Sequence, residues 1–313
     1  MVLVLLVPCV MCAKEIVLAL TLATGLVQRG ELNLEQLLGS PDQYGRYATE
    51  NQRGKIDPRP DAITQDYIEF ASTHALKEGP HFYQQSWALE IGGGYGFVSA
   101  EVVKRGGLVI FNDAEPKHWG KAEQILHDVG FDTSFEILPG WFAVGPGDLA
   151  DTSNLESFQP VKAILASMWL HFYTGREIAE KVLPKMWDIA KPGCEVFLKY
   201  GTPYNGLFKN YVRGYEARKR AFLRNPSLDN LPGEMADAHR YLPAAHYQSF
   251  FHAIDNDVMV YLASHDPGRR WEVVQEYRIR RPDPPEQSYK HGYAKGRTEI
   301  MGLRLRKPVT VPR

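Results

Sequence analysis

The chain has 313 residues, of which 44% are hydrophobic and 12% aromatic, so it can bury a large core and is not expected to be disordered throughout. Its 36 basic and 37 acidic residues nearly cancel, which argues against the broad positive surface that binds a phosphate backbone. The only cysteines are Cys9, Cys12 and Cys194, and a chain of this size does not depend on disulfides, so a reducing compartment is favoured.

The first 27 residues form two apolar blocks separated by Lys14 and Glu15. Neither block is long enough to span a bilayer. A signal peptide requires a basic residue before its apolar stretch, and none precedes the first block. Cys9 and Cys12 have no further Cys or His nearby to complete a metal site, so no metal is expected. We expect this segment to be a helix packed on a cytoplasmic protein, with membrane association or export through the apolar N-terminus as the alternative.

Residues 28–60 are polar and rich in Gly, Pro and Asp, which is typical of a loop or a mobile arm. Apolar residues then recur at near-helical spacing from Ile63 to Leu76, and Gly79 follows. This pattern predicts a helix that ends near Gly79 and leads into the next strand.

From residue 86 to residue 200, short apolar stretches alternate with helix-length segments. The predicted strands are 86–93, 108–113, 133–138, 161–168 and 194–200, and the predicted helices are 96–106, 117–130 and 175–193. Pro184 should kink the last helix or begin a second one. The alternation predicts a mostly parallel sheet with helices on both faces.

The pattern changes after Tyr200. Residues 201–250 are too long for a plain connection and are predicted to be an inserted lid. A run within them holds the basic residues Arg213, Arg218, Lys219, Arg220 and Arg224 against one acid, Glu216. Such a run indicates a solvated helix face, with an anionic ligand as the alternative. Residues 257–282 are predicted to be two strands joined by a turn at 266–268, and the tail to add a short strand with Leu303 and Leu305 inward.

Four glycines, at 92, 93, 94 and 96, lie between a predicted strand and a predicted helix. A glycine turn at this point lets a ligand approach the backbone and the exposed amides at the helix start. Phe97 stands where the dinucleotide fingerprint needs its third glycine, and no G-K-[ST] follows, which excludes a Walker loop. The spacing is instead Glu90-x-Gly92-x-Gly94-x-Gly96.

This spacing and the motifs after it, across residues 86–200, resemble the class I S-adenosylmethionine-dependent methyltransferases. "LEIGGGYG" resembles the first motif of that family, "VIFNDAEP" the second and "GDLAD" the third, and "KPG" resembles the turn into strand five. The resemblance implies an α/β Rossmann-like fold with a seven-stranded, mostly parallel sheet and an antiparallel edge hairpin. It also implies S-adenosyl-L-methionine as the cofactor.

The resemblance further implies which residues hold the cofactor. Gly92, Gly94 and Gly96 would cradle its methionine part, and Glu90 would help to hold its amino group. Asp113, or else Glu115, would accept hydrogen bonds from the ribose hydroxyls, and Asp148 would face the adenine amino group. The sequence departs from the family at Asn112, where a hydrophobic residue is usual, and this leaves the choice between Asp113 and Glu115 open.

His171 follows the predicted strand 161–168, where family members line the substrate cavity. It is the candidate catalytic base for a hydroxyl or thiol acceptor, and packing among Trp169, Phe172 and Tyr173 is the alternative. Because methyl transfer mainly needs alignment and exclusion of water, a dedicated base can also be absent.

These expectations divide the chain into four parts. Residues 1–80 form an N-terminal helical segment and a cofactor or substrate arm, 81–200 the cofactor-binding core, 201–250 the lid, and 251–313 the strands that complete the sheet together with a basic tail. The expected function is methyl transfer to a small molecule. The alternatives are a protein or RNA methyltransferase and a non-catalytic binding protein of the same fold, and the oligomeric state is left open.

Overall fold

The structure is a computed structural model that describes residues 61–76, 85–114, 116–130, 134–140, 142, 161–167, 169–170, 173–204, 212–232, 254–281 and 298–309. All of these residues belong to one compact unit, Arg59–Arg313. The predictions for the apolar N-terminus and the arm at 28–60, and those for Glu115, Asp148 and His171, lie outside the described residues.

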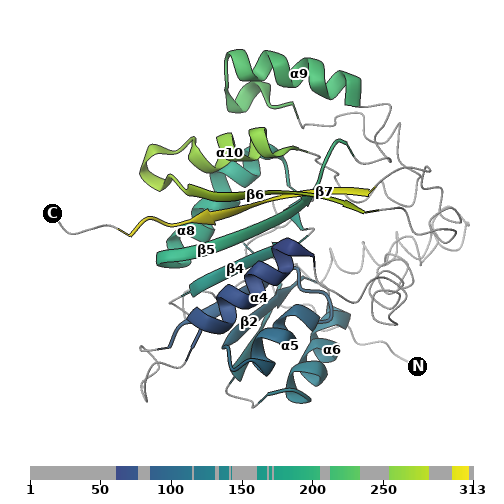
Figure 1. Ribbon diagram of the computed structural model, residues 1–313, viewed down its shortest axis with the longest axis vertical. Helices are drawn as coiled ribbons and strands as arrows, with labels where there is room; N and C mark the ends of the chain where they lie inside the picture. Colours follow the sequence, from purple (N-terminus) through teal and green to yellow (C-terminus); the bar gives the residue numbers. More distant parts are fainter. Residues whose placement is uncertain are drawn as a thin grey trace, which may run out of the picture. The chain divides into compact units, whose positions relative to one another are not determined.

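One seven-stranded sheet organises the described chain, in the order β3-β2-β1-β4-β5-β7-β6. Its strands are β1 Trp87–Ile91, β2 Val109–Asp113, β3 Phe135–Pro139, β4 Val161–Ser167, β5 Ala190–Gly201, β6 Glu272–Arg281 and β7 Thr298–Arg306. The strands β1 to β5 pair in parallel, whereas β7 is antiparallel to both β5 and β6. Figure 1 shows this antiparallel pair at one edge of the sheet. The predicted Rossmann-like fold is confirmed.

Helices cover both faces of the sheet because side chains along each strand alternate between them. In β1, Ala88 packs with the helices α4 (Ala62–His74), α5 (Phe97–Lys104) and α6 (Pro116–His127). Its neighbours Leu89 and Ile91 pack on the other face, with α8 (Leu183–Ile189) and α10 (Asn256–Ser264). The central strands are therefore buried on both sides, which explains their continuous apolar sequence.

The predicted break at Pro184 is confirmed. The segment begins with α7 (Gly175–Glu177), continues as a π-helix over Ile178–Val182 and passes into α8, with the proline in the first turn of α8. Proline has no backbone N–H and its ring displaces the preceding turn, so the wider π-helical turn accommodates it.

The prediction of a strand at the start of the segment 257–282 is wrong. Those residues form α10, whose N-cap Asp255 accepts a hydrogen bond from the backbone N–H of Val258. The buried residues Val258, Met259, Leu262 and Ala263 follow a helical repeat, which a short apolar run does not reveal by itself. The edge pair is therefore β6 with β7. As predicted, Leu303 and Leu305 of β7 are fully buried.

The basic run folds as a helix, α9 (Val212–Arg224), whose only fully buried side chains are Tyr215 and Phe222. Both belong to the core on the α8 and α10 face of the sheet. Arg213, Arg220 and Arg224 are exposed, in agreement with a solvated face. The exception is Lys219, which turns inward.

Candidate cofactor site

The glycine turn directly follows β1 and precedes α5. Since β1 lies between β2 and β4, the chain leaves β1 toward one half of the sheet and later returns to the other half. The carboxyl ends of parallel strands at such a switch point border a crevice in which ligands bind. The topology therefore places the predicted motif at the ligand-binding edge of the sheet.

Glycine is required at 92, 93 and 96 for reasons within the protein. Gly92 and Gly96 have φ angles of 66° and 74°, in the left-handed region that favours glycine. A Cβ at Gly92 would lie 3.1 Å from the Trp169 side chain. One at Gly93 would lie 2.5 Å from the ring of Phe111, which is too close. These positions shape the turn and let it pack tightly on the sheet.

Gly94 differs from its neighbours because its surroundings are open. Its φ is 60°, yet a Cβ built on it would meet no atom within 4 Å. The left-handed φ by itself favours glycine at this position. The open surroundings also leave room for a bound group to approach the Gly94 backbone, and a Cβ would project into that room.

Asp113, the last residue of β2, lies beside the glycine turn. Its Oδ2 accepts a hydrogen bond from the Gly94 N–H at 2.8 Å, and its Oδ1 lies 3.0 Å from Nδ1 of His118. Its backbone carbonyl accepts one from the Trp119 indole at 2.8 Å. The end of β2, the glycine turn and the first turn of α6 therefore meet at a single carboxylate.

Asn112, the departure from the family pattern, has a structural role. Its side chain is buried, and its Nδ2 donates to the carbonyls of Leu138 and Gly140 at 2.8 and 3.0 Å. These bonds join the end of β2 to the end of β3. A hydrophobic residue at position 112 could not donate to these two carbonyls. The asparagine therefore helps to fix the strand end that carries Asp113.

Glu90 is buried and turned toward α5. Its Oε2 accepts hydrogen bonds from the backbone N–H and the hydroxyl of Ser99, at 2.9 and 2.5 Å. The N-cap of α5, Gly96, has no side chain to satisfy these amides, so Glu90 acts as the cap from the neighbouring strand. Burial raises the pKa of Glu90 to about 7, although the Ser99 hydrogen bonds oppose this shift.

Three aromatic side chains that the sequence did not single out for the cofactor site lie beside it: Tyr95, His118 and Trp169. His118 is 7% exposed, and its ring meets Tyr95 of the glycine turn edge-on, with centroids 5.0 Å apart. Trp169 packs on Gly92 and against the rings of Phe142 and Tyr173. The only signal in the sequence is their place, since His118 and Trp169 each follow shortly after the end of a strand.

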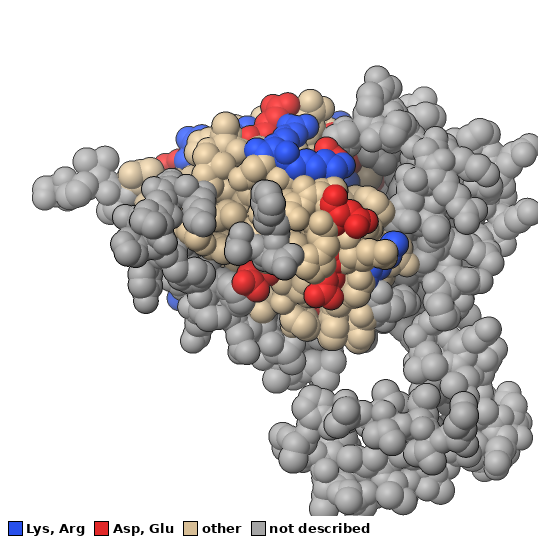
Figure 2. Space-filling view, turned by 90° about the horizontal axis from the view of Figure 1, so that it is seen from below, with Lys and Arg blue, Asp and Glu red and all other residues tan. Residues whose placement is uncertain are grey.

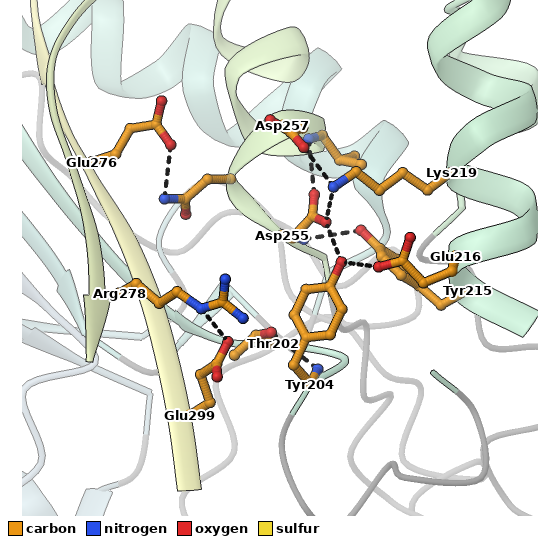
Figure 3. Close-up of polar contacts among 12 residues, drawn as sticks. Thr202, Tyr204, Tyr215, Glu216, Lys219, Asp255, Asp257, Glu276, Arg278 and Glu299 are labelled. Atoms are coloured by element: carbon orange, nitrogen blue, oxygen red, sulfur yellow. Dashed lines mark hydrogen bonds and ion pairs between the residues drawn. The ribbon is translucent and has the colours of Figure 1, made fainter. Parts of the chain in front are cut away.

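A polar cavity of about 250 Å³ lies where β6, β7 and the start of α10 face α9. Figure 3 shows Lys219 reaching from α9 to two carboxylates of α10, with its Nζ 2.5 Å from Asp255 and from Asp257. The Tyr204 hydroxyl donates to Asp255, the N-cap of α10, and to Glu216, which lies in α9. These contacts hold α9, part of the predicted lid, against the sheet domain.

Among the residues that the structure describes, no group of three or more His, Cys, Asp or Glu side chains is arranged to hold a metal ion. None of the helices in the described ranges combines the length and the apolar character needed to cross a membrane.

No protein-family profile matches the sequence, and neither does any curated protein. Among solved structures, a SAM-dependent methyltransferase from Methanosarcina mazei is similar with 14% identity and a TM-score of 0.45, over 71% of this chain and 92% of its own. Magnesium protoporphyrin IX methyltransferase from Synechocystis, solved with bound SAH, has 11% identity and a TM-score of 0.45 over 94% and 99%. An N-methyltransferase from Bradyrhizobium japonicum has 12% identity and a TM-score of 0.42 over 81% and 98%. At identities this low, the likeness concerns the fold alone.

Proposed function

We propose that the chain is an S-adenosylmethionine-dependent methyltransferase. The observation that carries this proposal is the open space at Gly94, bordered by the Asp113 carboxylate at the switch point of a Rossmann-like sheet. The residues fit the cofactor, because its methionine part needs close approach to backbone amides and its ribose needs an acceptor at the end of β2. The order of the motifs in the sequence supports the same assignment.

Each proposed residue has a distinct role toward the cofactor. The backbone at Gly92, Gly94 and Gly96 would hold the methionine part, and Asp113, with Glu115 as the alternative, would accept from the ribose. Asp148 would face the adenine. Glu90 would act mainly by holding the turn in place, since its carboxylate caps α5.

When bound, the cofactor supplies a methyl group already activated on a sulfonium. The protein then has to align the acceptor and exclude water, which the lid and the aromatic side chains around Trp169 would do. His171 is the proposed base for an acceptor that must lose a proton. We place the protein in the cytoplasm, because a chain of this size with three cysteines does not depend on disulfides.

A small molecule is the acceptor class that we favour. The chain is nearly neutral, and on the face in Figure 2 acidic side chains lie beside a small group of basic ones, with no broad basic surface drawn there among the described residues. A protein or RNA acceptor remains the alternative.

Incubation with methyl-labelled cofactor and a fractionated cell extract tests the proposal. We expect label to appear in the small-molecule fraction. Label in protein or RNA would overturn the acceptor class, and salt-sensitive binding would accompany an RNA acceptor. Cofactor binding without any labelled product would favour a non-catalytic binding protein, and no cofactor binding would overturn the proposal as a whole.

A further inference from the structure

We propose that His118 is a positioning residue for the cofactor: it holds the Asp113 carboxylate in the orientation that receives the ribose. The inference rests on the proposed function and goes beyond it, because neither the motifs nor the resemblance assigns His118 a role.

The two oxygens of Asp113 are held by different parts of the protein. Oδ1 lies 3.0 Å from Nδ1 of His118, which belongs to the first turns of α6. Oδ2 accepts from the amide of Gly94, at the open point of the glycine turn. A ribose hydroxyl that enters the space at Gly94 would meet the Oδ2 side of the carboxylate, while Oδ1 would stay bonded to His118.

His118 is well placed to be that anchor. The side chains of His118 and Asp113 are 9% and 10% exposed, so the bond between them is largely shielded from water. The edge of the imidazole also contacts Tyr95, which lies between Gly94 and Gly96. Because the carboxylate can only accept, Nδ1 must carry the hydrogen, which fixes the tautomer and the ring orientation.

Without this bond, the carboxylate of Asp113 would lose one of the contacts that fix its orientation and would be held less firmly in the orientation that receives the ribose. Removal of a group that orients a ligand-binding side chain typically lowers affinity roughly tenfold to a hundredfold at metal sites, and we expect a loss of similar size here. The loss should appear in cofactor affinity and should depend on Asp113.

The test compares two variants by calorimetric titration with S-adenosylhomocysteine. His118→Phe keeps a ring against Tyr95 but removes the donor, and we expect it to weaken binding roughly tenfold to a hundredfold. His118→Asn keeps an N–H donor near the position of Nδ1, so it should stay within about threefold of the parent protein. If His118→Phe does not fold, His118→Leu replaces it as the donor-free variant.

A double-mutant cycle shows whether His118 acts through Asp113. In an Asp113→Ala background, His118→Phe should cause no further loss of affinity. Nitrogen NMR of the free protein should also show the Nδ1-protonated tautomer of His118, and Asp113→Ala should abolish that preference.

Three results would overturn the inference while leaving the proposed function intact. They are equal losses in the phenylalanine and asparagine variants, a phenylalanine effect that persists without Asp113, and parent-like affinity of His118→Phe. A parent protein that does not bind S-adenosylhomocysteine would overturn both.

Discussion

A buried carboxylate, Glu90, holds the amino end of α5 against the sheet. It satisfies the N–H of Ser99, which the glycine N-cap cannot do. Burial works against the charged form and raises the pKa of Glu90 to about 7, despite the hydrogen bonds from Ser99. The folded protein therefore holds a proton at Glu90 more tightly than the unfolded chain does.

The free energy of unfolding should consequently depend on pH through Glu90. Its contribution is fully present below about pH 4.5, the ordinary pKa, and is lost as the pH rises through about 7. We expect Glu90→Gln to flatten the fall in stability between about pH 4.5 and pH 7, which amounts to as much as about 3 kcal/mol. Urea denaturation at several pH values measures this.

Glu101→Gln is the matched control, since it removes a half-exposed carboxylate from α5, the helix that Glu90 caps. It leaves Glu90 intact and should keep the parent's slope with pH. An unchanged slope in Glu90→Gln would show that another group is responsible.

The choice between Asp113 and Glu115 can be settled by affinity. Asp113 ends β2 and borders the open space at Gly94, so Asp113→Ala should weaken cofactor binding roughly tenfold to a hundredfold, more than Glu115→Ala does. Titration of both variants with S-adenosylhomocysteine provides the comparison. The reverse ranking would assign the ribose to Glu115.

Single residues differ in how far the sequence reveals them. Gly94 and Asp113 could be predicted to lie together because a strand, a glycine turn and a second strand end define their place. Asn112 and His118 could not, since their roles depend on what the fold brings to them. Asn112 bonds the carbonyl of Leu138, which is 26 positions away, and His118 depends on the side-chain direction of Asp113.

Among the helices and strands, α10 shows where hydrophobic periodicity alone does not predict the secondary structure. Nine residues, Asn256–Ser264, are too few for periodicity alone to separate a helix from a strand. The deciding contact is the capping of Val258 by Asp255, and this aspartate is itself held by Lys219 of α9. The helix start therefore depends on a distant segment.

This contact predicts that Lys219 stabilises the protein. The Asp255 side chain is 3% exposed, so Lys219→Met should leave a buried carboxylate without its cation and lower the free energy of unfolding by about 2 to 3 kcal/mol. Denaturation in urea measures the loss. The control is Arg220→Met, which removes one positive charge from the exposed side of α9 and should cost less than about 0.5 kcal/mol. Equal losses would contradict an internal role for Lys219.

At the scale of the whole molecule, the alternation of strands and helices from 86 to 200 was sufficient to predict the parallel sheet. The predicted neighbours 161–168 and 194–200 do pair, as β4 and β5. The insertion of β7 between β5 and β6 was not predictable, because β5 and β7 are about a hundred residues apart and their pairing is long-range.

We propose above that the cofactor lies against the backbone of Gly94, where a side chain would block it. Gly106 offers a matched control, since its φ is 86°, a Cβ there also meets nothing within 4 Å, and it lies beyond α5, away from the turn. Valine at either position imposes comparable backbone strain, so the two variants should lose similar stability.

The most direct measurement is calorimetric titration of S-adenosylmethionine into the parent protein, Gly94→Val and Gly106→Val. We expect binding to the parent protein and to Gly106→Val, and no detectable binding to a folded Gly94→Val. Parent-like affinity in Gly94→Val, or a parent protein that does not bind the cofactor, would contradict it.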